Sequence, residues 1–405
     1  MKKIAIIMGR GIEGCGVTKF TIEQIKWLSK NGFEYVVYAS KDKSWTRKNA
    51  HDVSNVIQIK FAKKDETQKM INACNECDVV IINSLPSVGH TEECINEFKR
   101  ALIEIKKPIV LVQHDHNARS IRRNAAIDES IKRADLIFGH SSTSDFAKIV
   151  HQTTNEIDMF SMFDAKSKSV INFQPGMDFD ELRKKYWLDI KDTNAYHHKW
   201  IGRTASWKGH DQFFKFHGEY LKPNGHISTL EGIERSPGWL GFKEMFEFND
   251  STGDNINEKE LKTNELAYVF GPFINDEMLK RMAKVAYGYQ LSLLDERFIE
   301  RSIEYTHCEL AAVGVIPVFR KAYGERCTHR LYGEKLVNCK NTGTIWLDDN
   351  NMQDSYDIIE KLSKDEVLRD EYRNMAFEFY KSHQDSNYTF SEMMDKILEN
   401  VNEIV

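Results

Sequence analysis

Two segments in the second half of the sequence carry charged side chains at positions where they could hold a phosphorylated ligand. In KWIGRTASWKG, residues 199–209, Arg203 follows a short apolar run and Lys208 comes five residues later. A guanidinium fork and an ammonium point charge near one strand end can together neutralise a diphosphate. The segment therefore predicts an anion site, although each cation taken alone is also an ordinary solvated surface charge.

The second segment, RSIEYTHCELAAVGVIPVFR at residues 301–320, predicts a helix that Gly314 ends and a strand that follows it. Glu304 and Glu309 lie five residues apart, so they do not share one helical face and can serve separate purposes. An acid in such a helix can accept hydrogen bonds from ribose or sugar hydroxyls, while the first helical amides face phosphate. Ligands of doubly wound sheets bind at strand ends of this kind.

A glycine-rich loop near the start of the chain has the spacing of a dinucleotide-binding fingerprint. Gly9, Gly11 and Gly14 follow the apolar run 4–8 at G-x-G-x-x-G spacing. A dinucleotide site also needs an acid at the end of the second strand, yet EYVVYAS has its only acid, Glu34, at the opposite end. The NAD interpretation therefore loses most of its support.

The same loop does not fit a P-loop either. Gly11 and Gly16 have the required separation, but Val17 and Thr18 stand where Lys and then Ser or Thr are needed. What remains is a strand, a glycine-rich turn and a helix that begins near Val17, where bare backbone N–H groups can meet an anionic ligand. The alternative is that the glycines only permit a tight turn.

The peptide VQHDH, residues 112–116, follows an apolar run and brings His114, Asp115 and His116 to a predicted strand end. An acid at such a position can orient or deprotonate an acceptor hydroxyl. The alternative is structural, since Asp115 or Asn117 could cap a helix that includes residues 120–133.

The elements that position these residues have an α/β rhythm, because short apolar runs alternate with amphipathic segments. After a break with Pro175 and Gly176, which is a candidate hinge, the rhythm restarts. Two successive doubly wound domains are the most economical architecture. The predicted strands are 3–8, 34–40, 78–84, 108–114 and 135–141, then 199–203, 226–232, 266–272, 287–294, 314–320 and 344–348.

Composition excludes several classes of protein. The 405 residues include 41% hydrophobic and 29% charged side chains, which are ordinary globular values. The apolar runs are too short for a signal peptide or a membrane span, so we expect a cytoplasmic protein. A net charge of −5 argues against a generally basic nucleic-acid binder. Cys74 and Cys77 form a C-x-x-C without a second pair, which is either a metal or redox site or two small residues near a helix end.

Five peptides together resemble the DNA α-glucosyltransferases of T-even bacteriophages, which are nucleotide-sugar transferases of the GT-B fold. The peptides are GRGIEGCGVTKF, VQHDH, WIGRTASWKG, EGIERSP and SIEYTHCELAAVGVIPVF, in the same order over nearly the whole chain. The resemblance implies two Rossmann-like domains facing a central cleft. It further implies 1–172 as the acceptor DNA side, 173–385 as the UDP-sugar side, and a C-terminal helix at 386–405 that packs back on the first domain.

The resemblance also implies donor-binding roles. Arg203 and Lys208 match the pair that holds the donor diphosphate and stabilises the leaving UDP, with no metal or other cofactor required. Glu309 matches the glutamate that takes the ribose hydroxyls. Glu304 is assigned to the donor sugar or nucleotide, although retaining GT-B transferases space their two glutamates further apart. The remaining donor-binding residues are Gly14, Gly16 and Val17 in the first-domain loop, and Tyr305 and Thr306 through their amides.

For the acceptor, the resemblance implies transfer of a sugar with retained α configuration to the hydroxymethyl group of 5-hydroxymethylcytosine in duplex DNA, after base flipping. His114 would contact the donor sugar, and Asp115 would orient or deprotonate the hydroxyl. Two basic clusters suit DNA phosphates or are ordinary solvated surface. They contain Arg119, Arg122 and Arg123, and Lys43 and Arg47.

Three alternatives stay open at this point. Glucose is the expected sugar, but a pentose from UDP-arabinose would need only small changes in the pocket. A GT-B transferase acting on a polysaccharide or lipid is a second alternative, and a non-catalytic nucleotide-binding or NAD-dependent protein is a third. The expected partners are UDP-sugar and hydroxymethylated double-stranded DNA in the cytoplasm of an infected bacterial host, with the phage replication machinery as a further candidate and no membrane.

Overall fold

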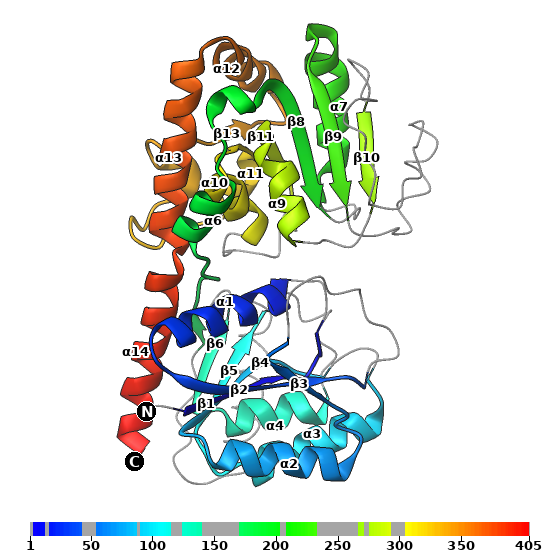
Figure 1. Cartoon of the computed structure of the whole chain (residues 1–405), viewed down its shortest axis with the longest axis vertical. Coiled ribbons are helices and arrows are strands. Elements are labelled where there is room, and N and C mark those ends of the chain that lie inside the picture. Colours follow the sequence, from blue (N-terminus) through cyan, green and yellow to red (C-terminus); the bar gives the residue numbers. More distant parts are fainter. Residues whose placement is uncertain are drawn as a thin grey trace. The chain divides into compact units, whose positions relative to one another are not determined.

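The chain folds into two compact units, each built on one parallel sheet (Figure 1). The computed structural model describes residues 3–12, 16–42, 54–86, 90–114, 124–139, 170–202, 208–232, 266–270, 275–292 and 304–404. The first unit holds the residues up to Gly176 together with Ser386–Val405, and the second lies within Met177–Asp385.

The first unit has a seven-stranded sheet in the order β3-β2-β1-β4-β5-β6-β7, and all its neighbouring strands pair parallel. Its strands are β1 (Lys3–Met8), β2 (Glu34–Ser40), β3 (Val56–Ile59), β4 (Val79–Ser84), β5 (Ile109–Gln113), β6 (Leu136–Gly139) and β7 (Ile171–Asn172). Its described helices are α1 (Gly16–Lys30), α2 (Lys64–Asn75), α3 (Glu92–Glu104), α4 (Ala125–Arg133) and α14 (Ser386–Ile404).

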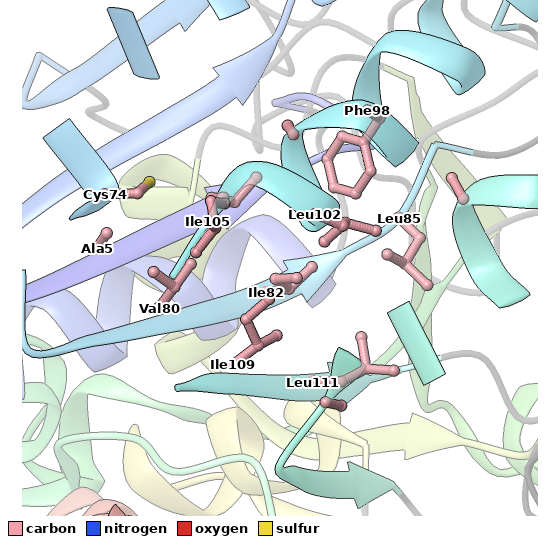
Figure 2. Close-up of a cluster of buried hydrophobic side chains, with 14 of the residues drawn as sticks. Ala5, Cys74, Val80, Ile82, Leu85, Phe98, Leu102, Ile105, Ile109 and Leu111 are labelled. Carbon is pink, nitrogen blue, oxygen red and sulfur yellow. The ribbon is translucent and has the colours of Figure 1, made fainter. Parts of the chain in front are cut away.

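Helices α2, α3 and α4 cover one face of this sheet and α1 covers the other (Figure 1). Figure 2 shows part of this core, to which Phe98 and Leu102 of α3 and Ile82 of β4 belong. Every residue of β4 is buried. Strands buried on both faces are nearly continuous apolar runs, which is why β1 and β4 are recognisable in the sequence.

On the other face, α14 returns from the second unit and packs against α1. The Phe20 ring of α1 meets the Phe390 ring of α14 edge-on at 5.4 Å, and the Gln24 amide donates to Met393 Sδ at 3.8 Å. The last helix of the chain therefore completes the core of the first unit.

The second unit repeats the architecture with a six-stranded parallel sheet in the order β10-β9-β8-β11-β12-β13. Its strands are β8 (Asn194–Gly202), β9 (Ile227–Gly232), β10 (Leu266–Phe270), β11 (Val285–Gln290), β12 (Ile316–Arg320) and β13 (Ile345–Leu347). Its described helices are α6 (Phe179–Tyr186), α7 (His210–Phe216), α9 (Asn275–Ala283), α10 (Tyr305–Ala312), α11 (Lys321–Gly324), α12 (Met352–Lys364) and α13 (Glu366–Gln384), with short 3₁₀ or π turns at Ile190–Asp192, His217–Leu221, Lys222–Asn224 and Leu336–Asn338.

Side chains that alternate along β8 serve two separate cores, one on each face of this sheet. Trp200 lies in the cluster with α7 and α12, while its neighbour Ile201 lies in the cluster with α6, α9, α10 and α13. This alternation follows from the two-residue period of a strand. Both faces of the sheet are therefore covered, as a doubly wound domain requires.

The predicted hinge region contains the point where the chain leaves the first unit, between Gly176 and Met177. The expected boundary after residue 172 falls four residues earlier. A Cβ at Gly176 would overlap the Thr389 hydroxyl, so the close approach of α14 requires glycine here. The Met177 N–H donates to the Gln384 carbonyl at 3.0 Å, next to the point where the chain returns.

Two further expectations have clear outcomes. Cys74 and Cys77 are buried, reduced thiols at the end of α2, and Cys77 Sγ donates to the Ala73 carbonyl at 3.3 Å. Burial raises the pKa of the Cys77 thiol, so these cysteines are small core residues. None of the described helices is long and apolar enough to cross a membrane.

Candidate donor site and family membership

Two of the charged residues predicted in the second unit, Lys208 and Glu304, meet at the carboxyl end of its sheet, beside the end of β11. Lys208 lies two residues before α7, and Glu304 is the residue before α10. Lys208 Nζ lies 2.5 Å from Glu304 Oε2. The side chains are only 11% and 25% exposed, so this ion pair is shielded from solvent far more than a surface pair.

Lys208 is placed by the turn that precedes α7. The indole N–H of Trp200 donates to the Lys208 carbonyl at 3.3 Å. Gly209, the next residue, has a φ of +68°, in the left-handed region that favours glycine. The turn therefore presents Lys208 at the carboxyl end of the sheet, beside the end of β11.

Sequence reasoning placed Glu304 inside a helix, and this was wrong. Helix α10 begins at Tyr305, and Glu304 has extended backbone with a φ of −71° and a ψ of 151°. Its carboxylate makes no capping bond to the helix and turns to Lys208 instead. Tyr305 and Thr306 form the first turn of α10, as their expected amide role requires.

Glu309 lies one turn further into α10 and is buried, with 4% of its surface exposed. The two glutamates are therefore in different surroundings, one in an ion pair before the helix and one inside it. The separate roles expected for the two glutamates, including that of Glu309 at the ribose, stay predictions.

Among the described residues, two neutral side chains also bond to the ion pair, and sequence reasoning missed both. Gln290 ends β11 and Ser292 follows two residues later, and they are 1% and 0% exposed. The Gln290 amide donates to Glu304 Oε2 at 3.0 Å. Their only signal in the sequence is their polarity within the apolar run YGYQLSLL.

In the first unit, the candidate site residue that the structure describes at a strand end is His114, directly after β5. Its ring meets Phe20 edge-on at 4.7 Å and Phe173 at 5.3 Å. Burial, together with the nearby positive charge of Arg10, lowers the pKa of His114 to about 3. The imidazole is therefore neutral at physiological pH and suited to hydrogen bonding with an uncharged hydroxyl.

The glycine loop after β1 is shaped by close packing. A Cβ at Gly9 would lie 2.6 Å from Pro86 Cδ, and one at Gly11 would lie 2.5 Å from the Ser40 carbonyl oxygen. Gly11 also has a φ of +86°. The structure thus supports the tight-turn interpretation for these two glycines. Gly16 and Val17 open α1, as expected.

Asp42, the acid nearest the end of β2, accepts the backbone N–H of Phe61 at 2.5 Å and the Ser40 hydroxyl at 3.1 Å. A dinucleotide site needs such an acid for the ribose hydroxyls. Because this carboxylate already holds the loop after β3, the structure gives no support to the NAD interpretation.

The alternative that Asp115 or Asn117 caps the following helix is wrong for α4. That helix begins at Ala125, and Asn124 caps it by accepting the N–H groups of Ala126 and Ile127 at 2.9 and 3.1 Å. Several other predicted site residues lie outside the described residues. They are Gly14, Lys43, Arg47, Asp115, Arg119, Arg122, Arg123 and Arg203.

Known proteins match this chain over nearly its whole length. It is 42% identical over 401 residues to the DNA alpha-glucosyltransferase of Enterobacteria phage T4, covering 98% of this chain and 99% of that protein. A solved alpha-glucosyltransferase in complex with UDP matches with a TM-score of 0.90, over 98% of this chain and 100% of that one. A structure of such an enzyme with UDP-glucose and DNA containing an abasic site matches with a TM-score of 0.89, at 42% identity over 98% and 99% of the two chains.

A more distant structure, Anabaena Alr3699/HepE in complex with UDP and glucose, matches at 13% identity with a TM-score of 0.62. The match covers 98% of this chain and 100% of that one. At this identity, the similarity concerns the fold alone. The family model for DNA alpha-glucosyltransferase matches residues 15–367. With the two parallel-sheet units, these matches confirm the GT-B fold, and the chain belongs to the DNA alpha-glucosyltransferase family.

Proposed function

We propose that this protein transfers glucose from UDP-glucose to the hydroxymethyl group of 5-hydroxymethylcytosine in duplex DNA, with retention of the α configuration. The observation that carries the proposal is the 42% identity to the T4 enzyme over 98% of the chain. Solved relatives were captured with UDP-glucose and with DNA containing an HMU base. The shielded Lys208–Glu304 pair supplies matching chemistry at the carboxyl end of the second sheet.

In this proposal the second domain binds the donor. Lys208 and Arg203 neutralise the diphosphate and stabilise the negative charge that develops on UDP as the glycosidic bond breaks. The amides of Tyr305 and Thr306 face phosphate, Glu309 takes the ribose hydroxyls, and Glu304 takes the sugar or the nucleotide. The reaction needs no metal, because the two cations supply the charge stabilisation.

The first domain serves the acceptor in this proposal. Asp115 orients or deprotonates the hydroxymethyl group. The glycine loop with Gly14, Gly16 and Val17 contacts the phosphate and the sugar of the donor. The target base leaves the stack, because a cytosine inside a duplex does not expose its hydroxymethyl group to an enzyme site. The DNA phosphates are bound by basic side chains, which are Arg119, Arg122, Arg123, Lys43 and Arg47. The reaction takes place in the cytoplasm of the infected host.

One assay tests the proposal as a whole. Hydroxymethylated and unmodified DNA are incubated with UDP-glucose or UDP-arabinose, and the nucleosides are analysed by mass spectrometry. We expect a hexose mass gain on hydroxymethylcytosine alone. A pentose gain would assign the protein as an arabinosyltransferase, and no gain with either donor would contradict a DNA acceptor and favour a polysaccharide or lipid.

The pH dependence of transfer tests the part played by His114. Because its pKa lies near 3, the imidazole stays neutral from pH 5 to 8, and its hydrogen bond to the sugar should persist over that range. We therefore expect His114→Asn to lower the transfer rate by a similar factor at pH 5.5 and at pH 8. A wild-type ionisation near pH 6.5 that disappears in this variant would contradict a neutral His114.

A further inference from the structure

The lysine of the proposed donor site is one of four residues that are joined in a closed ring of hydrogen bonds. Lys208 Nζ donates to Glu304 Oε2 at 2.5 Å and to Ser292 Oγ at 3.4 Å. The Ser292 hydroxyl in turn donates to Gln290 Oε1 at 3.0 Å, and Gln290 Nε2 donates to Glu304 Oε2 at 3.0 Å. The ring joins the end of β11 to the residues before α7 and α10.

The donors and acceptors in this ring fix the orientation of the Gln290 amide. Its oxygen must accept from Ser292 while its nitrogen donates to the carboxylate of Glu304. Gln290 and Ser292 are both essentially inaccessible to solvent, so water does not replace a bond that is lost. Hydrogen bonds to a charged group in such surroundings are among the strong ones in proteins.

In the ring, the Lys208 ammonium is already paired with the Glu304 carboxylate. A diphosphate that binds Lys208 must therefore compete with that carboxylate for the ammonium. When the lysine turns to the phosphates, the Gln290 amide remains as a donor to Glu304 Oε2. We infer that Gln290 is a positioning residue of the donor site, held by Ser292, which keeps Glu304 in place while Lys208 changes partner from carboxylate to diphosphate. This inference rests on the proposed function.

The sharpest variant is Gln290→Glu, which keeps the shape but replaces the amide donor with a second carboxyl 3.0 Å from Glu304. Two carboxyls at that distance share a proton at low pH. When the pair loses that proton at higher pH, it gains a negative charge and binds the Lys208 ammonium more strongly. Measured by isothermal titration calorimetry, the UDP affinity of Gln290→Glu should fall about tenfold more than that of wild type between pH 6 and pH 8.5.

A matched control exists on α12, where the exposed Gln353 donates to the carboxylate of Asp357 at 2.7 Å. Gln353→Glu makes the same chemical change beside a carboxylate, and its UDP affinity should follow wild type at every pH. A second variant, Ser292→Ala, removes the hydroxyl that holds Gln290 and should weaken UDP binding about fivefold without a new pH dependence. It keeps the inference testable if Gln290→Glu does not fold.

The outcomes separate this inference from the function on which it rests. Wild-type protein that binds no UDP would overturn the proposed donor and the inference with it. Wild-type protein that binds UDP, with Gln290→Glu following the pH dependence of Gln353→Glu or with Ser292→Ala at wild-type affinity, would overturn the role of Gln290 alone. Parallel thermal melts at pH 6 and 8.5 show that the binding differences are not loss of fold.

Discussion

Replacing Lys208 with Ala is expected to lower kcat/KM for transfer from UDP-glucose by about 10²- to 10³-fold, because one preorganised charge at the leaving group is lost. The effect should fall mainly on kcat. The ammonium matters most when charge develops on UDP, and less while the intact donor is bound. Steady-state rates with hydroxymethylated DNA at saturating acceptor, together with the Kd for UDP, measure the two contributions separately.

The structure offers a matched lysine for this experiment. Lys185 Nζ also lies 2.5 Å from a carboxylate oxygen, that of Asp276, but its side chain is 55% exposed. Lys185→Ala removes the same type of ion pair from a solvated site, and transfer should change by no more than about twofold. If Lys208→Ala and Lys185→Ala had equal rates, the diphosphate role of Lys208 would be wrong.

Lys208→Arg is an informative third variant, because it keeps the charge and changes its shape. The guanidinium is planar and binds carboxylates as a fork, whereas the ring around Lys208 is built for an ammonium that contacts a carboxylate and a hydroxyl. We expect a rate between those of wild type and Lys208→Ala. This order would separate the loss of charge from the loss of geometry.

Most of the strands could be predicted from the sequence, because buried strands appear in it as short apolar runs. The bounds of β1 and β2 agree with the predicted runs 3–8 and 34–40. β1 is buried and apolar from Ile4 to Met8, whereas β2 is buried only from Val37 onward and was recognised by its β-branched and aromatic residues. β3 was missed for the converse reason. It is an edge strand whose residues Ile57 and Gln58 are exposed, so its apolar pattern is interrupted.

Only the charged half of the candidate donor site could be predicted from the sequence, for a different physical reason. Lys208 and Glu304 carry charge, and charge near strand ends is a visible signal. Gln290 and Ser292 are neutral, and their role depends on bonds to partners that are distant in sequence, Gln290 by 14 residues and Ser292 by 84. Such pairings follow from the order of the strands in the sheet, which no local pattern of residues contains.

The largest expected effect on stability belongs to Gly209, the residue between Lys208 and α7. Its φ of +68° is a conformation that costs a residue with a Cβ about 1 kcal/mol. A Cβ there would overlap the Leu291 carbonyl oxygen and lie 2.6 Å from the carbonyl carbon, both of them backbone atoms. Neither atom can move without shifting the end of β11, so we expect Gly209→Ala to cost about 3 kcal/mol or more.

A second glycine separates the two causes of that cost. Gly225 has a φ of +81°, and a Cβ there would meet no atom within 4 Å. Gly225→Ala should therefore cost only the conformational part, about 1 kcal/mol, as measured by urea unfolding. Equal losses for both variants would show that backbone conformation alone explains the effect and that the Leu291 contact contributes nothing.

Gly209→Ala should also impair the proposed donor site, because Leu291 lies between Gln290 and Ser292 in the chain. A shift of that peptide would lengthen the bonds from both side chains to the Lys208–Glu304 pair. We therefore expect folded Gly209→Ala protein to bind UDP more weakly than Gly225→Ala protein at a temperature where both are native. The same contact that demands glycine at this turn would then link the stability of the second domain to the placement of its lysine.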